Sequence, residues 1–164
     1  MRPALFLNAQ TQERFKALLS TGEFLRADNP THHLCVYFLP FNPATSQVFM
    51  VHHKKAGKWL SPGGHLEPNE TLLEMLNREI GEELGVVSAL ATLQAPFLFT
   101  VTEPLSGKRA CQSHYDLWFI YKTDGAKFKV DMSEFHETRW LSVPDARAIV
   151  TDPNNLLALT RVRS

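Results

Sequence analysis

The chain has 164 residues, of which 44% are hydrophobic and 21% are charged, a composition typical of one soluble globular domain with a single core. Lys and Arg number 17, as do Asp and Glu, so the formal net charge is zero. A neutral chain has no overall field that would hold it on nucleic acid or on an anionic membrane, so neither is an expected partner. No apolar run reaches the roughly 18 residues of a membrane-spanning helix, and the one at the N-terminus is too short for a signal peptide. These features predict a cytoplasmic protein.

The two cysteines, Cys35 and Cys111, each lie in an apolar stretch and do not form a Cys-x-x-Cys pair. Structural zinc sites and disulfide frameworks usually need more thiols at characteristic spacings. We therefore expect both side chains to be small buried groups in a reducing compartment.

The first third of the chain predicts a helix followed by a β-hairpin. Residues 10–25 carry a weak helical pattern of apolar positions, and the Asp-Asn-Pro sequence at 28–30 interrupts it. The apolar, β-branched and aromatic run at 34–39 predicts a buried strand. A proline-containing turn at 40–43 and a second strand at 48–52 complete the hairpin.

A short strand is expected at 59–60, ending at the Pro-Gly-Gly turn 62–64. A strong helix follows over about 69–84. Asn69 is a suitable N-cap residue, and Gly85 is a suitable terminator.

The rest of the chain is richer in strands. Residues 86–101 are apolar enough for one or two strands, with Pro96 at a bulge or an edge. A polar loop is expected at 103–109, an aromatic-rich strand at 115–122 and another strand near 138–141.

Two short helices are expected near the C-terminus. Ser142 can cap the first, with Pro144 in its first turn, and the second begins near Asp152-Pro153. Strands mixed with a few helices, without a repeat or a long linker, predict a single α/β domain over residues 1–164. Residues 1–30 form its N-terminal helical extension.

The helix at 69–84 carries the chemistry. Its apolar stripe packs on the sheet and consists of Leu73, Leu76, Ile80 and Leu84. Glu79, Glu82 and Glu83 lie together on the neighbouring face, where carboxylates at this spacing repel one another. A hard divalent cation relieves that repulsion, because it takes carboxylate oxygens as ligands. Magnesium or manganese held there can bridge phosphate oxygens, and the glycines before the helix let the backbone approach it closely.

The spacing of residues 64–86 also resembles a known family. The chain reproduces the complete Nudix box, and every specified position matches. These positions are Gly64, Glu70, Arg78, Glu79, Ile80, Glu82, Glu83, Gly85 and Val86. The resemblance to MutT-like Nudix hydrolases implies an α/β/α sandwich with a mixed sheet, in which the box forms a loop–helix–loop.

The resemblance implies a role for each matching position. Glu79, Glu82 and Glu83 would hold Mg²⁺ or Mn²⁺, with Glu79 also a candidate general base. Glu70 and Arg78 would shape the loop and helix of the catalytic box. A backbone carbonyl at Gly63 or Gly64 often completes the metal shell in relatives.

Candidates outside the box are less specific. Many members recruit a further carboxylate from a downstream loop, for which Glu134 is the first candidate, followed by Glu137 and Glu103. The candidate substrate-binding residues are His65, after the glycine turn, Lys58 in the preceding polar turn, and Asp116 on the aromatic strand. One of several aromatic residues could stack on a nucleobase: Phe99, Tyr115, Trp118 or Tyr121.

The resemblance implies hydrolysis of a phosphoanhydride bond in a nucleoside diphosphate linked to some group X. A nucleoside triphosphate or a nucleotide sugar fits that class, in a monomer or a homodimer. The signatures of the ADP-ribose, dinucleoside polyphosphate and coenzyme A hydrolases are poorly matched or missing. Two alternatives remain open: a non-catalytic nucleotide sensor on the same fold, and an isomerase or RNA-processing member of the superfamily.

Overall fold

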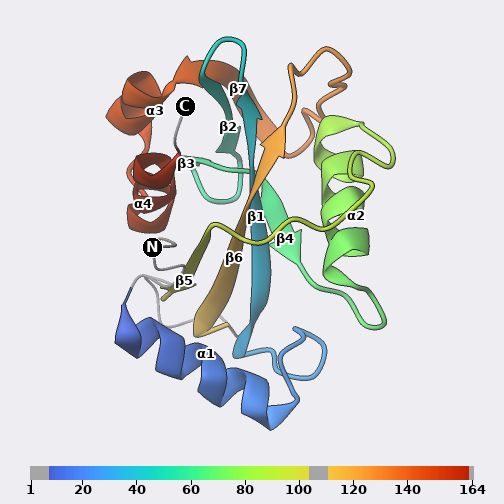
Figure 1. Cartoon of the computed structure of the whole chain (residues 1–164), viewed down its shortest axis with the longest axis vertical. Coiled ribbons are helices and arrows are strands. Elements are labelled where there is room, and N and C mark those ends of the chain that lie inside the picture. The colour runs from blue at the N-terminus through green and yellow to red at the C-terminus, as the bar shows by residue number, and fades with distance from the viewer. Residues whose placement is uncertain (1–7, 104–110, 163–164) are drawn as a thin grey trace.

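The computed structural model describes residues 8–103 and 111–162, in which helices cover both faces of a mixed sheet (Figure 1). The strands are β1 (His32–Asn42), β2 (Gln47–His53), β3 (Lys58–Leu60), β4 (Gly63–His65), β5 (Leu98–Thr102), β6 (Ser113–Lys122) and β7 (Phe135–Ser142). The helices are α1 (Ala9–Thr21), α2 (Leu72–Leu84), α3 (Val143–Ile149) and α4 (Pro153–Arg161). No helix in these two stretches is both long enough and apolar enough to cross a membrane.

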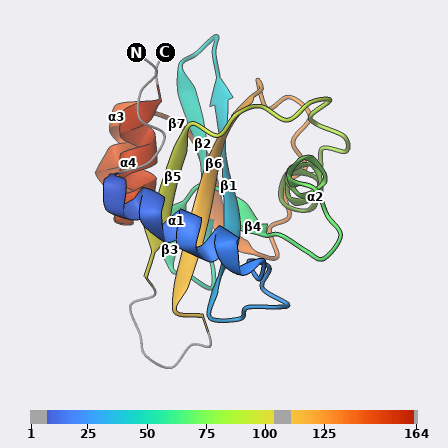
Figure 2. The same ribbon diagram turned by 60° about the horizontal axis from the view of Figure 1, so that its bottom comes forward.

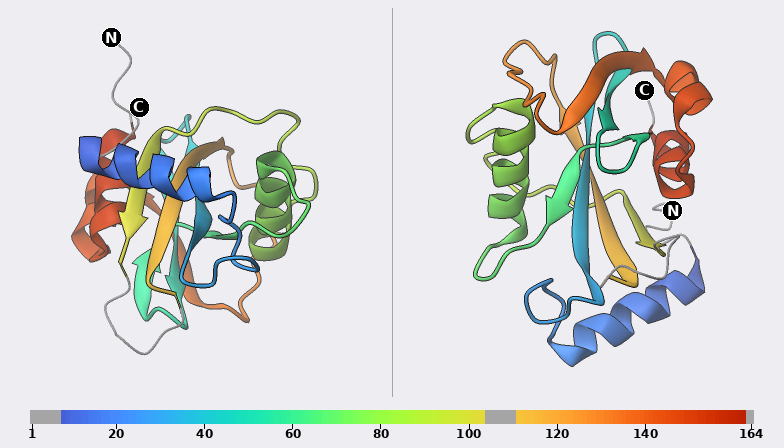
Figure 3. Two further views of the ribbon diagram at one scale, coloured as in Figure 1. Left: turned by 90° about the horizontal axis from the view of Figure 1, so that it is seen from below. Right: turned by 180° about the vertical axis from the view of Figure 1, so that it is seen from behind.

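Strand β1 is the centre of the sheet. It pairs with β6 in parallel along ten residues, while the pairings with β2 and β4 are antiparallel. The sheet runs in the order β3-β2-β1-β6-β5, with β4 beside β1 and β7 beside β2. Helix α2 covers one face, and α3 and α4 cover the other (Figure 3). The predicted α/β/α sandwich with a mixed sheet is confirmed.

The two faces have separate cores. Val36 and Phe38 of β1 pack with Ile80 and Leu84 of α2, whereas Leu39 of β1 packs with α3 and α4. This alternation follows from the two-residue period of a strand. Helix α1 crosses the end of the sheet (Figure 2), where its Phe15 ring contacts Phe99 and Tyr115 with centroids 5.3 and 5.2 Å apart.

The start of α2 differs from its prediction. The N-cap residue is Thr71, and Asn69 lies before the helix with a φ of 64°. The Thr71 hydroxyl accepts a hydrogen bond from the Glu74 N–H, and the Glu74 carboxylate accepts one from the Thr71 N–H. This reciprocal capping box satisfies two otherwise unpaired donors, which explains why the helix begins there.

The boundaries of β1 and β5 also differ from the predicted ones. Strand β1 continues through Pro40 to Asn42, whose side chain then accepts a hydrogen bond from the Ala44 N–H and fixes the turn. Of the apolar stretch 86–101, the structure forms a strand only from Leu98 onward, in β5. Most of the loop expected at 103–109 lies outside the described residues. The predicted cap of α3 by Ser142 is confirmed, and α4 begins where predicted, with Asp152 as its N-cap residue.

Candidate active site

A polar cleft of about 850 Å³ opens between α2, β4 and the segment after β6. Its lining residues are Arg26, Ala27, His53, Lys55, Gly63, Gly64, His65, Leu66, Glu67, Pro68, Arg78, Glu79, Glu82, Glu83, Asp131 and Glu134. The three glutamates predicted as metal ligands therefore share this cleft with Gly64, His65 and Glu134.

Glu79 and Glu83 form the buried wall of the cleft. They are only 8% and 6% exposed, while the Glu82 side chain is 62% exposed. The backbone N–H of Gly63 hydrogen-bonds to the Glu83 carboxylate, yet the buried Oε2 of Glu83 has no hydrogen-bond partner. An unpaired buried carboxylate oxygen is costly unless a cation balances it.

Strand β4 approaches the glutamates closely because it consists largely of glycine. A Cβ at Gly64 would overlap the carboxyl group of Glu79, and a Cβ at Gly63 would overlap the carbonyl oxygen of Val36. Side chains at these positions would displace either the Glu79 carboxylate or β4 itself. The glycines thus allow backbone and carboxylate oxygens to converge on one point.

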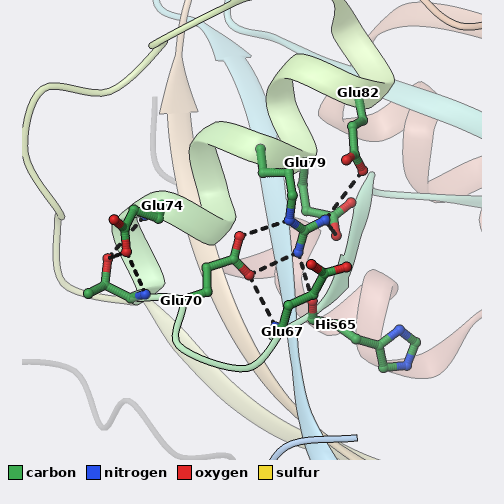
Figure 4. A network of polar contacts seen from close by, with 8 residues as sticks. His65, Glu67, Glu70, Glu74, Glu79 and Glu82 are labelled. Atoms are coloured by element: carbon green, nitrogen blue, oxygen red, sulfur yellow. Dashed lines mark hydrogen bonds and ion pairs between the residues drawn. The ribbon is translucent and has the colours of Figure 1, made fainter. Parts of the chain in front are cut away.

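Glu70, Glu79 and Glu82 belong to one network of polar contacts (Figure 4), in which Arg78 is the shared donor. Its Nε and Nη2 donate to the two oxygens of Glu70 at 2.8 and 3.0 Å, a bidentate geometry that fixes the guanidinium. Its Nη1 donates to Glu79 Oε1 at 2.8 Å and to Glu82 Oε2 at 3.3 Å, and its Nη2 donates to the carbonyl oxygen of His65 at 3.0 Å. Through these hydrogen bonds, Arg78 of α2 is connected both to Glu70 and to the end of β4.

The electrostatics of the wall favour a bound cation. Burial raises the pKa of Glu79 and, more strongly, that of Glu83, where the Glu79 charge adds to the effect. The hydrogen bond from Arg78 partly offsets this for Glu79. A divalent ion bound to both carboxylates would restore their charged forms. All these donors are hard oxygens, so the site fits Mg²⁺ or Mn²⁺.

The segment between β6 and β7 brings further acids to the opposite margin. The N–H of Asp131 donates to the carbonyl of Glu83 at 3.0 Å, which ties the segment to the end of α2. Lys54 fixes the part of the segment near Glu134. Its backbone N–H donates to the Glu134 carbonyl at 2.9 Å, and its Nζ donates to two further carbonyls of the segment. Glu134 thereby lines the cleft. Glu103 and Glu137, its alternatives, pair with arginines outside it.

Asp116 is fully buried and does not line the cleft. One of its oxygens accepts hydrogen bonds from the hydroxyls of Thr100 and Thr102 at 2.9 and 2.6 Å. The indole N–H of Trp118 donates to Thr100 and completes this polar network. Its assignment to substrate was wrong, because alternation along β6 identifies a face of the sheet without identifying what covers that face.

Lys58 also lies outside the cleft, at the start of β3 rather than in the turn where it was expected, whereas Lys55 in the turn before β3 lines the cleft. The aromatic candidates for base stacking are not lining residues either, since the Trp118 ring stacks on Tyr37 and Phe99 packs against Phe15. Tyr115, Trp118 and Tyr121 are buried and Phe99 is half-buried, so the structure does not place these rings in the cleft.

His65 does line the cleft, and its surroundings keep it neutral. Burial lowers the pKa of His65 to about 3, and the neighbouring His114 and His33 add to the effect. Its imidazole can therefore exchange hydrogen bonds with a ligand but brings no positive charge to a phosphate.

Besides Lys55, four polar lining residues were not predicted as site residues: Arg26, His53, Asp131 and Glu67. Arg26 and Asp131 come from segments far from the box along the chain. Glu67 lies between Gly64 and Glu70, and its position inside the box was the one available signal.

The family model described as NUDIX domain matches residues 31–160. An RNA pyrophosphohydrolase of Erythrobacter litoralis is 33% identical over 107 residues, covering 56% of this chain and 63% of that protein. The chain thus spans less than two thirds of the length of this relative.

Solved structures agree on the fold. The dihydroneopterin triphosphate pyrophosphohydrolase of E. coli superposes with a TM-score of 0.65 at 19% identity, covering 77% of this chain and 91% of that one. A NUDIX-family hydrolase of Clostridium perfringens gives a TM-score of 0.61 at 25% identity, with coverage of 78% and 93%. The match to the family model spans most of the chain and includes the whole glutamate wall, so the chain belongs to the Nudix family.

Proposed function

We propose that the chain is a metal-dependent Nudix pyrophosphohydrolase that cleaves a phosphoanhydride bond in a nucleoside diphosphate linked to a further group. One observation carries this proposal: Glu79 and Glu83 are buried side by side at the wall of an open cleft, with one Glu83 oxygen unpaired. Two such carboxylates destabilise a fold unless a cation joins them. We further propose that residues 1–164 form one domain, with 1–30 as an extension.

The residues that would hold Mg²⁺ or Mn²⁺ are Glu79, Glu82 and Glu83, with the backbone carbonyl of Gly64. When bound, the cation neutralises charge on phosphate oxygens and lowers the pKa of a coordinated water. Arg78 keeps the Glu79 carboxylate in place by occupying its Oε1. Because the carboxylate is already held in position, less reorganisation is needed to reach the transition state.

The remaining groups of the cleft fit a polyphosphate and its attacking water. Arg26 and Lys55 line the cleft and can pair with phosphate oxygens away from the metal. The exposed Glu134 faces the glutamates from the opposite margin. It can accept a proton from water or serve as an additional ligand, and Glu79 is the alternative base.

A second candidate substrate is the polyphosphorylated end of an RNA. The observation that favours it is the name of the relative from Erythrobacter litoralis, an RNA pyrophosphohydrolase. An RNA chain contains an anhydride bond only where its end carries a diphosphate or triphosphate, so the same metal chemistry would apply. The neutral net charge favours small nucleotides as the first candidate.

The test is a screen with Mg²⁺ and with Mn²⁺ against nucleoside triphosphates, nucleotide sugars, dinucleotides and 5′-triphosphorylated RNA, with products identified by mass. The product masses report which bond breaks, and hydrolysis in ¹⁸O-labelled water reports which phosphorus is attacked. We expect metal-dependent turnover that is abolished by EDTA. Nucleotide binding without turnover across the whole panel would contradict the enzyme and support the sensor.

The matched variants are Glu83→Gln and Glu74→Gln. Both remove one negative charge from α2, but Glu74 belongs to the capping box, in which glutamine is also accepted. Only Glu83→Gln should abolish turnover. Equal loss in both variants would indicate that α2, rather than the metal site, had been damaged.

A further inference from the structure

A second cluster of metal-binding side chains lies on the sheet, apart from the glutamates. His33 and Cys35 are two residues apart on β1 and therefore point to the same face. The neighbouring strands place His114 of β6 opposite His33, and His65 of β4 opposite Cys35. Three strands thus bring three imidazoles and one thiol together.

We propose that His33, Cys35, His65 and His114 form a binding site for a transition-metal cation of the zinc class, distinct from the carboxylate site. Their potential ligand atoms all lie within 4.8 Å of one another. Tetrahedral zinc with bonds of about 2.0–2.3 Å requires ligand atoms about 3.3–3.8 Å apart. Side-chain rotations that close the cluster by about 1 Å therefore suffice.

The contacts of His33 prepare one nitrogen for a cation. Its Nδ1 lies 3.0 Å from the carbonyl oxygen of Asn29, an acceptor, so Nδ1 carries the proton and donates it. Nε2 then carries the electron pair, which here lies 3.7 Å from the Cys111 Sγ and would exchange that thiol contact for the cation. A carbonyl that fixes the tautomer in this way is the usual partner of a metal-bound histidine.

The donor set selects a different metal from the one expected at α2. Imidazole and thiolate are borderline or soft ligands that suit Zn²⁺, Co²⁺ or Cu²⁺, whereas the carboxylates of Glu79 and Glu83 suit Mg²⁺. The spacing of the two cysteines predicted no zinc site, because spacing rules consider only ligands that are close together in the sequence. Here strand pairing brings together residues up to 81 positions apart, which no Cys-x-x-Cys pattern reports.

Burial and access both suit a resident cation. His33 and Cys35 are buried, while His65 and His114 are half-buried and His65 reaches the cleft. A cation can therefore enter from that side. On binding, four bonds to the metal form and the Cys35 thiol releases its proton to the solvent, without any oxidant.

Occupancy would affect the neighbouring glutamate wall. A cation joined to His65 would cross-link β4 to β1 and β6 immediately beside Gly64. The proposed site is therefore structural and would fix the glycine strand against which Glu79 packs. This assignment does not depend on the proposed hydrolysis, because it can be tested by binding alone.

The experiment loads the full chain with Co²⁺ in the presence of excess Mg²⁺, which occupies hard oxygen sites. We expect one Co²⁺ per chain, with the visible spectrum of tetrahedral cobalt and a thiolate-to-cobalt charge-transfer band. Zn²⁺ should displace it, and one equivalent of Zn²⁺ should raise the melting temperature. A spectrum without the thiolate band, or no stoichiometric binding, would overturn the proposal.

Variants assign the ligands. Cys35→Ser should remove the charge-transfer band, and it should lower affinity by more than the roughly 10–100-fold typical of an outer-shell partner. Because Cys35 is in the core, the half-buried His114→Gln provides a second variant with little risk to folding, and it should also weaken binding. Cys111, whose Sγ lies 3.7 Å from His33 Nε2, is the closest competing thiol.

The matched controls are Cys111→Ser and the exposed His136→Ala, which remove the same donor types elsewhere. Both should bind Co²⁺ as the parent chain does, and so should Glu83→Gln. If Cys111→Ser loses the band while Cys35→Ser retains it, the proposed ligand set is wrong. If Glu83→Gln loses the ion, the metal belongs to the carboxylate site and the proposal fails, whatever the chain hydrolyses.

Discussion

Glu83 and Asp116 are equally hidden from solvent, at 6% and 0% exposure, and each has one buried oxygen without a hydrogen-bond partner. Their surroundings differ. Glu83 lies in the wall of an open cleft beside Glu79. Asp116 is enclosed between β5 and β6 and receives hydrogen bonds from two threonine hydroxyls. No other side chain in residues 8–103 and 111–162 leaves a buried oxygen or nitrogen unpaired in this way.

The difference shows that burial of an acid does not by itself mark a catalytic group. Burial raises the pKa of both carboxyls, and a neighbouring acid adds to the effect at each, but of the two only Glu83 lines the open cleft. There a cation can enter and neutralise the charge. At Asp116 the carboxyl keeps its proton below its raised pKa of about 7, and the hydrogen bonds from Thr100 and Thr102 partly stabilise the charged form.

The largest effect is expected for Glu83→Gln, which tests the member of the pair that lies in the cleft wall. Loss of one metal-ligating oxygen should lower kcat by at least about a hundredfold, comparable to loss of one key transition-state contact. The free energy of unfolding measured in EDTA should not fall, because an unpaired buried charge has been removed. Steady-state kinetics with saturating Mg²⁺ and urea denaturation provide the two measurements. Near-normal kcat would remove Glu83 from the ligand set.

A second large effect is expected for Gly64→Ala. The new Cβ would overlap the Glu79 carboxyl group, so that group must move and kcat should fall about tenfold or more. Gly81→Ala is the matched control on α2, where the new Cβ meets nothing closer than 3.8 Å. Alanine should stabilise the helix there by up to about 1 kcal/mol with kcat unchanged. Similar losses of kcat in both variants would contradict the role of the glycine strand.

The effect of Asp116, the member of the pair outside the cleft, is expected in the pH dependence of the free energy of unfolding. Burial raises the pKa of Asp116 from 3.8 to about 7, so between these values the folded chain binds a proton that the unfolded chain has released. The free energy of unfolding should therefore fall as pH rises from about 4 to about 7. With about 1.36 kcal/mol per pKa unit, this contribution is at most a few kcal/mol.

Asp116→Asn removes that proton and should flatten the decline. Urea denaturation in EDTA at pH 5 and pH 8 measures it. The exposed Asp124→Asn serves as control and should follow the parent chain. If Asp116→Asn declines as steeply as the parent, the Asp116 proton does not control this pH range.

The smallest effect is expected at the cleft margin. Lys55→Gln should raise KM for a nucleotide a few-fold with kcat nearly unchanged, as for the loss of an exposed ion pair worth about 0.2–1 kcal/mol. Lys58→Gln is the matched control, because Lys58 follows this turn at the start of β3 and does not line the cleft. Equal KM in the two variants would show that the turn does not bind phosphate.

Much of the fold was predictable because it depends on local rules. The predicted aromatic-rich strand is β6, Ser142 caps α3 as predicted, and α4 begins at the predicted Asp152-Pro153. The start of α2 was placed wrongly because two cap-like residues, Asn69 and Thr71, compete. The reciprocal bond from Glu74 decides between them.

The glutamate wall was also predictable, since its residues lie on one helix with fixed spacing. The rest of the cleft was not, because it depends on which distant segments meet. Lys54 ties the segment carrying Glu134 to the turn after β2, and no pattern in the sequence records that bond. The meeting of His33, His65 and His114 likewise requires the strand register, and β1 pairs with β6 in parallel across a long separation.

The tie between Asp131 and Glu83 has a consequence for how this cleft can diversify. The segment from 128 to 134 forms the margin that faces a substrate, yet its backbone bonds directly to a residue of the glutamate wall. Insertions between Asp131 and Glu134 would therefore disturb the chemistry together with the choice of substrate. Changes of chain length are better tolerated between Asp124 and Lys127, where the described residues make no backbone hydrogen bond to α2. Selectivity in this scaffold should accordingly change by replacement of side chains at the margin, with its length conserved.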